Sequence, residues 1–141
     1  MYSSLVAVPA RRHPMQVLMA GLLTLSGVGI LAGGPPPNSV SAVLPAAMVY
    51  VWAAILTVGG ALVVAAALVG PLAALYLEVA ADLPLCLGCY AYSTAIWIVA
   101  GSRAATVSAM ITGVAIAFGV RFWQVLKTLR LLSSELRRRS R

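Results

Sequence analysis

Residues 43–69 read VLPAAMVYVWAAILTVGGALVVAAALV, a long apolar run without a single charged residue. A helix of about 20 apolar residues is enough to cross the roughly 30 Å of hydrocarbon in a bilayer. Pro45 suits the first turn of such a helix, and Gly70-Pro71 ends it. This stretch therefore predicts a membrane-spanning helix.

Three further apolar runs lie on either side of this one, at residues 15–33, 72–100 and 104–126. The prolines at 35–37 separate the first two runs because proline cannot continue a helix. Pro84 lies inside the run 72–100, so we expect one tilted and kinked helix there, or a short interfacial helix that leads into a span. The four runs together predict four transmembrane helices.

The predicted fold is an all-α polytopic membrane protein with a basic amphipathic C-terminal tail. Its expected parts are a cytoplasmic segment (1–14), a transmembrane domain (15–126) and the tail (127–141). A signal peptide is the competing interpretation of residues 15–33, but the apolar core of a signal peptide covers only about 7–15 residues. The run here is longer and no clear Ala-x-Ala cleavage site follows it, which favours an uncleaved helix.

The composition agrees with a membrane protein. Hydrophobic residues make up 62% of the chain and charged residues 9%, with a mean hydropathy of +0.99, whereas soluble domains are about 25% charged. No loop between the apolar runs is long enough to build a preorganised catalytic site. We therefore predict that the chain is not an enzyme and needs no cofactor or metal.

The positive charges predict the orientation of the chain. The net charge is +7, and most of the cations lie at the two ends of the sequence rather than in a nucleic-acid-binding pattern. If both ends are cytoplasmic, that side carries Arg11, Arg12, Lys127, Arg130, Arg137, Arg138, Arg139 and Arg141, whereas the opposite side carries only Arg103. Positive residues concentrate on the cytoplasmic side of membrane proteins. The chain is therefore expected to have both termini in the cytoplasm, N-in and C-in.

The tail is expected to contact the membrane surface. Leu129, Leu132 and Leu136 recur at three- and four-residue spacing, which is typical of an amphipathic helix along the surface. Basic residues on such a helix attract anionic lipids. The predicted lipid contacts are Arg130, Arg137, Arg138, Arg139 and Arg141.

An acid and a base at matched depth predict an interhelical ion pair. Glu78 lies seven residues after Pro71 and Arg121 six residues before Lys127, which places both about 10 Å from the same membrane face at about 1.5 Å per residue. A charge at membrane depth is costly and needs a partner or water. We expect Glu78 to pair with Arg121.

A polar stripe follows Glu78 on the same predicted helix. At about 100° per residue, one sector of the helix carries Glu78 together with Asp82, Cys86, Cys89 and Ser93. The stripe has either a structural role in fixing helix packing, or a functional role as a wetted path or oligomer contact. In the second case Asp82 is the ionisable element, protonated in lipid or charged in a water-filled lumen.

The two cysteines form a Cys-x-x-Cys pair, a spacing used by redox and metal sites. The chain has no third cysteine. We therefore favour ordinary small apolar cysteines over redox or metal chemistry.

Small residues recur every fourth position in the last apolar run, at Ala105, Ala109, Gly113 and Ala117, and lead to Arg121. Small residues let another helix approach closely in a membrane. This series predicts a helix-packing face that turns Arg121 toward protein, and it favours a homo-oligomer or another membrane protein as partner.

Several short motifs resemble a group of small four-span membrane proteins encoded by actinobacterial phages. They are Arg11-Arg12-His13-Pro14 before the first span, the Gly-Pro-rich loop after it, Gly70-Pro71 with Leu77-Glu78, Tyr90 in the third span, and Arg121-Phe122-Trp123-Gln124-Val125 at the end of the fourth. The resemblance covers most of the chain. It implies a phage membrane protein, holin-like or without an assigned role, and carries over no catalytic residue.

Three function classes fit these expectations. The first is a holin, which oligomerises and permeabilises the host inner membrane during lysis. The second is a non-lytic membrane protein, such as a superinfection-exclusion factor or a structural subunit of a membrane complex. The third is a small transporter, which is disfavoured because four-span exporters carry their membrane carboxylate in the first span, and no acidic residue precedes Glu78.

Overall fold

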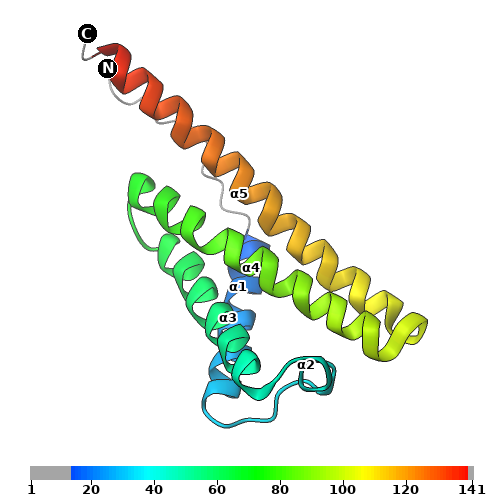
Figure 1. Cartoon of the computed structure of the whole chain (residues 1–141). Helices are drawn as coiled ribbons and strands as arrows, with labels where there is room; N and C mark the ends of the chain where they lie inside the picture. Colours follow the sequence, from blue (N-terminus) through cyan, green and yellow to red (C-terminus); the bar gives the residue numbers. More distant parts are fainter. Residues whose placement is uncertain (1–13, 140–141) are drawn as a thin grey trace.

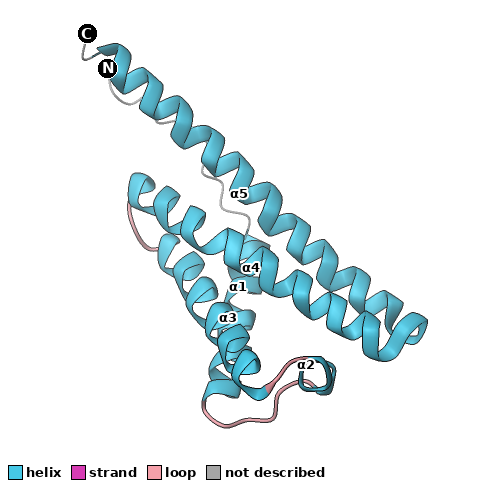
Figure 2. Ribbon diagram, in the orientation of Figure 1, coloured by secondary structure: helices cyan, strands magenta, loops and turns pink. Residues whose placement is uncertain are grey.

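The computed structural model describes residues 14–139, and all regular secondary structure in this part of the chain is helical, with short loops between the helices (Figures 1 and 2). The elements in chain order are α1 (Pro14–Leu31), α2 (Asn38–Val43), α3 (Ala46–Ala66), α4 (Pro71–Ala100), the short 3-10 helix η1 (Gly101–Ala104) and α5 (Ala105–Arg139). The predicted all-helical class is confirmed for the described residues.

Three helical segments are long and apolar enough to cross a membrane: 14–31, 46–66 and the continuous helical stretch 71–135. The third segment folds back on itself at η1, where Gly101 adopts a positive φ of 55°. Its two arms, α4 and α5, then lie side by side with opposite chain directions (Figure 1). Three helical segments that could cross a membrane agree with the predicted membrane protein, whereas the count of four crossings stays a prediction.

The second predicted span, 43–69, is shorter in the structure than in the sequence pattern. The short helix α2 occupies Asn38–Val43, and α3 begins only at Ala46. Leu44 between them is extended, with φ −105° and ψ 139°, because the residue before a proline is disfavoured in the helical region. Pro45 therefore stands at the N-cap of α3 instead of in its first turn.

Helix α4 is a single helix that contains Pro84, as predicted for the run 72–100. Gly70 caps its start and Pro71 occupies the first turn, where the missing N–H of proline has no helical partner to lose. Helix α5 does not break at Lys127 as the predicted tail boundary implied, but continues to Arg139. Residues 127–139 thus continue the same helix instead of forming a separate one, because no Gly or Pro interrupts them.

The helices pack mainly in succession, α1 against α3, α3 against α4, and α4 against α5. The core between them is built from side chains of every long helix, including Ala20, Ala53, Leu56, Leu85 and Phe118, each at most 2% exposed. Trp52 of α3 joins this core to α4, because its Nε1 donates a hydrogen bond of 3.0 Å to the carbonyl oxygen of Gly88.

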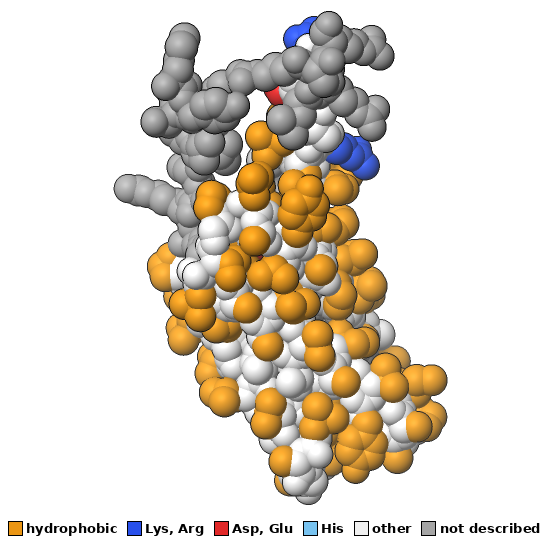
Figure 3. All heavy atoms as spheres, turned by 90° about the vertical axis from the view of Figure 1, so that its left-hand side faces the viewer, with side chains coloured by type: hydrophobic (Ala, Val, Ile, Leu, Met, Phe, Trp, Pro, Cys, Tyr) orange, Lys and Arg blue, Asp and Glu red, His pale blue; other side chains and the backbone are white. Residues whose placement is uncertain are grey.

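The outer surface is strongly apolar. Leu18, Leu25, Met48, Tyr76 and Ile98 are among the large hydrophobic residues that are more than 40% exposed. Figure 3 shows such side chains covering most of one face, with the visible Lys and Arg side chains near one end. A surface of this kind is stable in lipid rather than in water.

Several predicted cations fall outside this description. Arg11, Arg12 and Arg141 lie beyond the described residues, and nothing is described of the side chains of Arg137 and Arg139. The predicted orientation and the lipid contacts of the tail therefore stay predictions. Arg130 and Arg138 are exposed on the last part of α5, as a lipid contact requires.

Candidate functional site: a buried charge cluster

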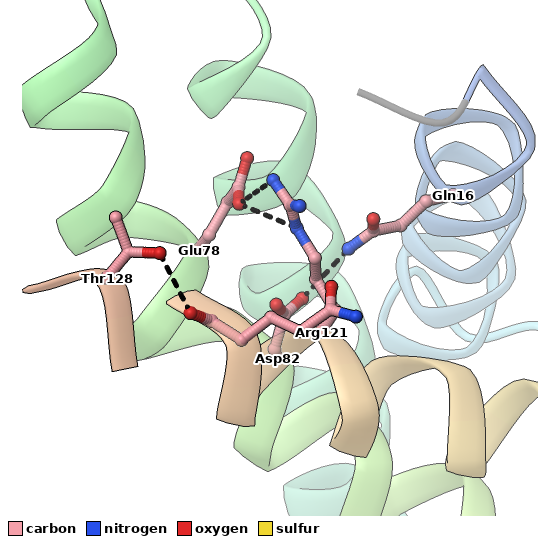
Figure 4. Close-up of polar contacts among 6 residues, drawn as sticks. Gln16, Glu78, Asp82, Arg121 and Thr128 are labelled. Atoms are coloured by element: carbon pink, nitrogen blue, oxygen red, sulfur yellow. Dashed lines mark hydrogen bonds and ion pairs between the residues drawn. The ribbon is translucent and has the colours of Figure 1, made fainter. Parts of the chain in front are cut away.

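Glu78 and Arg121 meet between α4 and α5, as their matched depth predicted. Arg121 donates to the same carboxylate oxygen twice, from Nε at 3.0 Å and from Nη2 at 2.7 Å to Oε2 of Glu78 (Figure 4). The Glu78 side chain is 7% exposed and that of Arg121 17%. Both charges are thus largely withdrawn from the outer surface.

The antiparallel packing of α4 and α5 explains how these residues meet. Near the turn at η1, Ser93 of α4 contacts Ser108 of α5, 15 residues away in the chain. Further from the turn, Glu78 contacts Arg121, 43 residues away. Both helices rise by the same length per residue. Residues at nearly equal numbers of positions from the Ser93–Ser108 contact, one on each helix, therefore lie opposite each other, as Glu78 and Arg121 do.

Asp82, one turn after Glu78, is fully buried with 0% exposure. Its Oδ1 accepts a hydrogen bond of 3.2 Å from Nε2 of Gln16 on α1. Its Oδ2 is buried and has no hydrogen-bond partner. Figure 4 shows Gln16 reaching toward Asp82 from the opposite side to Glu78. The cluster therefore joins α1, α4 and α5.

Gln16 is a member of the site that the sequence analysis missed. The prediction of intramembrane partners rested on formal charge, and an amide carries none. The available signal was that Gln16 is a strong hydrogen-bonding residue in the apolar run 15–33. In a membrane such an amide requires a polar partner on another helix, and Asp82 supplies it.

The other residues of the predicted stripe also face the protein interior but lie apart from the charge cluster. Ser93 shares a buried hydroxyl cluster with Ser108 and Thr112 of α5, with oxygen–oxygen distances of 2.7 Å to each. Cys86 contacts α5, because a Cβ at Gly119 would stand 3.3 Å from its Sγ.

Cys89 is buried and lines a fissure of about 200 Å³ together with Trp52 and Tyr92. Both cysteines are free thiols. No group of three or more His, Cys, Asp or Glu side chains that could hold a metal ion occurs within residues 14–139.

The predicted small-residue face does not form a buried contact within residues 14–139, and its contact with another helix stays a prediction. Ala109, Gly113 and Ala117 are exposed, and a Cβ at Gly113 would meet nothing within 4 Å. Helix α5 instead buries Ser108, Ala115, Phe118 and Val125. The physical reason is that residues four apart turn by about 40° per step, so the series drifts around the helix and Arg121 points away from its start.

Helices α1 and α3 approach each other closely where the spacing Ala-x3-Thr-x2-Gly occurs once on each helix. The two copies are Ala20, Thr24 and Gly27 on α1, and Ala53, Thr57 and Gly60 on α3. Each glycine lies against the other copy: a Cβ at Gly27 would come within 2.6 Å of the Ala53 carbonyl oxygen, and one at Gly60 would collide with the Ala20 carbonyl. The repeated spacing was a signal that could have predicted this contact.

No protein-family model matches the chain, and no match was found among curated proteins or among solved structures.

Proposed function

We propose that this chain is a small phage-type membrane protein that spans a bacterial inner membrane four times, N-in and C-in, and acts without permeabilising it. In this role it is a superinfection-exclusion factor or a structural subunit of a membrane complex, not an enzyme. The observation that carries the proposal is the inward placement of its intramembrane charges, set against an apolar exterior.

Two properties support four crossings. Helices α4 and α5 contain 30 and 35 residues, which correspond to about 45 and 52 Å at about 1.5 Å per residue, more than the roughly 30 Å of hydrocarbon. Arg103, the exposed cation between residues 14 and 126, lies in the turn that joins them. A charged turn belongs at a membrane surface.

The placement of charge argues against a wet pore in this arrangement. A lesion filled with water needs polar or charged side chains along its wall. Glu78 and Arg121 satisfy each other, and Asp82 is enclosed by the helices of its own protomer. A protomer whose charges are neutralised inside it has an apolar outer surface that is compatible with lipid. Such a surface suits a structural subunit of a membrane complex.

A holin is the second candidate, and the exposed series Ala109, Gly113 and Ala117 favours it. These small residues are exposed on α5 without a described partner in the chain, on a face that also carries the exposed side chains of Ile116 and Val120. Such a face suits close approach by a helix of another protomer, and homo-oligomerisation precedes lesion formation by a holin.

Inducible expression in a bacterium loaded with a potential-sensitive dye tests the choice. A non-lytic protein leaves the membrane potential and growth unchanged at an expression level verified by immunoblot, and a phage challenge of the same cells then tests exclusion. An abrupt collapse of the potential would reject the non-lytic role and support the holin. A matched control is Gly113→Leu, which blocks the small face of α5 and would abolish a lesion that depends on it.

A further inference from the structure

We propose that Asp82 Oδ2 is a proton-binding site, and that one proton together with Arg121 neutralises the two carboxyl groups of the cluster. The inference rests on the hydrogen bonds and burial of these side chains and is independent of the proposed function. The ligand is a single exchangeable proton per chain, held between α1 and α4.

The two oxygens of Asp82 have different surroundings. Oδ1 accepts from the Gln16 amide at 3.2 Å, whereas Oδ2 is buried without a partner. An ionised carboxylate has two equivalent acceptor oxygens and loses heavily when one of them is buried and unsatisfied. A neutral carboxylic acid has one carbonyl oxygen and one hydroxyl. The amide donor on Oδ1 makes that atom the carbonyl, so the proton belongs on Oδ2.

The Arg121 guanidinium, the cation of the cluster, is already paired with Glu78. Arg121 directs both Nε and Nη2 to Oε2 of Glu78, and no hydrogen bond joins it to Asp82 within the described contacts. Two ionised carboxylates one helical turn apart would leave the cluster with a net negative charge at membrane depth. One bound proton removes that charge.

The other elements packed around Asp82 supply no alternative cation. On its own helix the nearest ionisable groups are Glu78 and Cys86, and α5 contributes Arg121. The described residues of α1 contain no charged side chain, and neither does α2. Helix α3 carries a single ionisable group, Tyr50, in its first turn. A proton can neutralise Asp82 without any further ligand, because it binds to a single oxygen.

Infrared spectroscopy of the full chain in lipid vesicles tests the site directly, because the chain has three acidic side chains in all. A protonated carboxyl group has a C=O stretch that is separate from the bands of the carboxylate and the amide, and the stretch shifts in deuterated buffer. We expect this band in the wild-type protein at neutral pH. It should disappear in Asp82→Asn and remain in the matched control Glu135→Gln, which alters the acid of the exposed tail.

Two further variants test the sharing of charge. In Glu78→Gln the Arg121 guanidinium loses its partner and pairs with Asp82 instead, so the band is lost although Asp82 is intact. In Arg121→Gln both carboxyl groups must be neutral, so the band grows. Titration of the wild-type protein needs no variant: raising the pH should remove the band.

Three outcomes overturn the proposal. They are a wild-type protein without the band at neutral pH, a band that persists in Asp82→Asn, and a Glu78→Gln variant whose band is as strong as that of the wild type. The first would mean that water solvates an ionised Asp82, and the last would mean that Asp82 does not share the Arg121 charge.

Discussion

Arg121 of α5 holds Glu78 of α4 by two hydrogen bonds to one oxygen, at 3.0 and 2.7 Å, in a region where neither side chain is exposed by more than 17%. The pair thereby fixes the register of the two longest helices far from the turn that connects them. Its energetic role differs from that of a surface ion pair, because removing one partner leaves the other charge without solvent.

The Glu78–Arg121 pair predicts strong coupling in a double-mutant cycle. Glu78→Ala should destabilise the protein by less than the about 3–5 kcal/mol of an uncompensated buried charge, because the Arg121 guanidinium can then pair with Asp82. The double variant Glu78→Ala/Arg121→Ala should be less harmful than the sum of the two single variants. Unfolding of the purified protein in mixed micelles gives the free energies, and strictly additive losses would reject the coupling.

The contact between α1 and α3 predicts that Gly60 tolerates no side chain. Gly60→Ala places a methyl group against the Ala20 carbonyl and the Thr24 hydroxyl, so we expect a loss of about 1–3 kcal/mol from forced separation of the helices. Gly21→Ala is the matched control, because a Cβ there meets nothing within 4 Å. Thermal unfolding of both variants measures the difference, and equal stability of the two would contradict the close contact.

Trp52→Phe tests the hydrogen bond that joins α3 to α4. The substitution keeps an aromatic ring in the core but removes the Nε1 donor that contacts the Gly88 carbonyl at 3.0 Å. We expect a loss of about 0.5–1.5 kcal/mol, the usual net contribution of one intramolecular hydrogen bond, because the Gly88 carbonyl lies inside α4 and keeps its helical donor. Trp97→Phe is a control for the loss of a tryptophan, since Trp97 is 54% exposed. A Trp52→Phe variant as stable as its control would show that the bond contributes nothing.

Four crossings predict that both termini lie on the same side of the membrane. Reporter tags fused to each end should both be active in the cytoplasm, and a cysteine at position 103 should be labelled from the outside by an impermeant reagent in a cysteine-free background. Tags that report from opposite sides would mean an odd number of crossings and would exclude the assigned orientation.

The Glu78–Arg121 contact could be predicted from the sequence because it depends on two simple quantities. One is the constant rise of a helix, and the other is the position of the helix ends, which Pro71 and Lys127 marked approximately. The contact formed at the expected place although α5 does not end at Lys127. Two antiparallel helices place Glu78 and Arg121 at the same distance from one membrane face, whether or not α5 continues beyond that face.

Other features depend on rotation about the helix axis, which sequence spacing describes less well. The series from Ala105 to Ala117 looked like one face because its spacing is regular, yet a strict step of four residues winds around the helix. Gln16 was missed because the depth argument applied only to charged side chains, and Gln16 is an uncharged amide that reaches Asp82 from a helix 66 residues away. The break at Leu44 was readable in principle, because it depends only on the proline that follows.

Helix α5 has no break between Ala105 and Arg139, so its basic end and its buried cation form one stiff rod. At about 1.5 Å per residue, this rod carries Arg138 roughly 25 Å beyond Arg121. Because the rod is continuous, the depth at which its basic end meets the membrane surface also sets the depth of the guanidinium that holds Glu78.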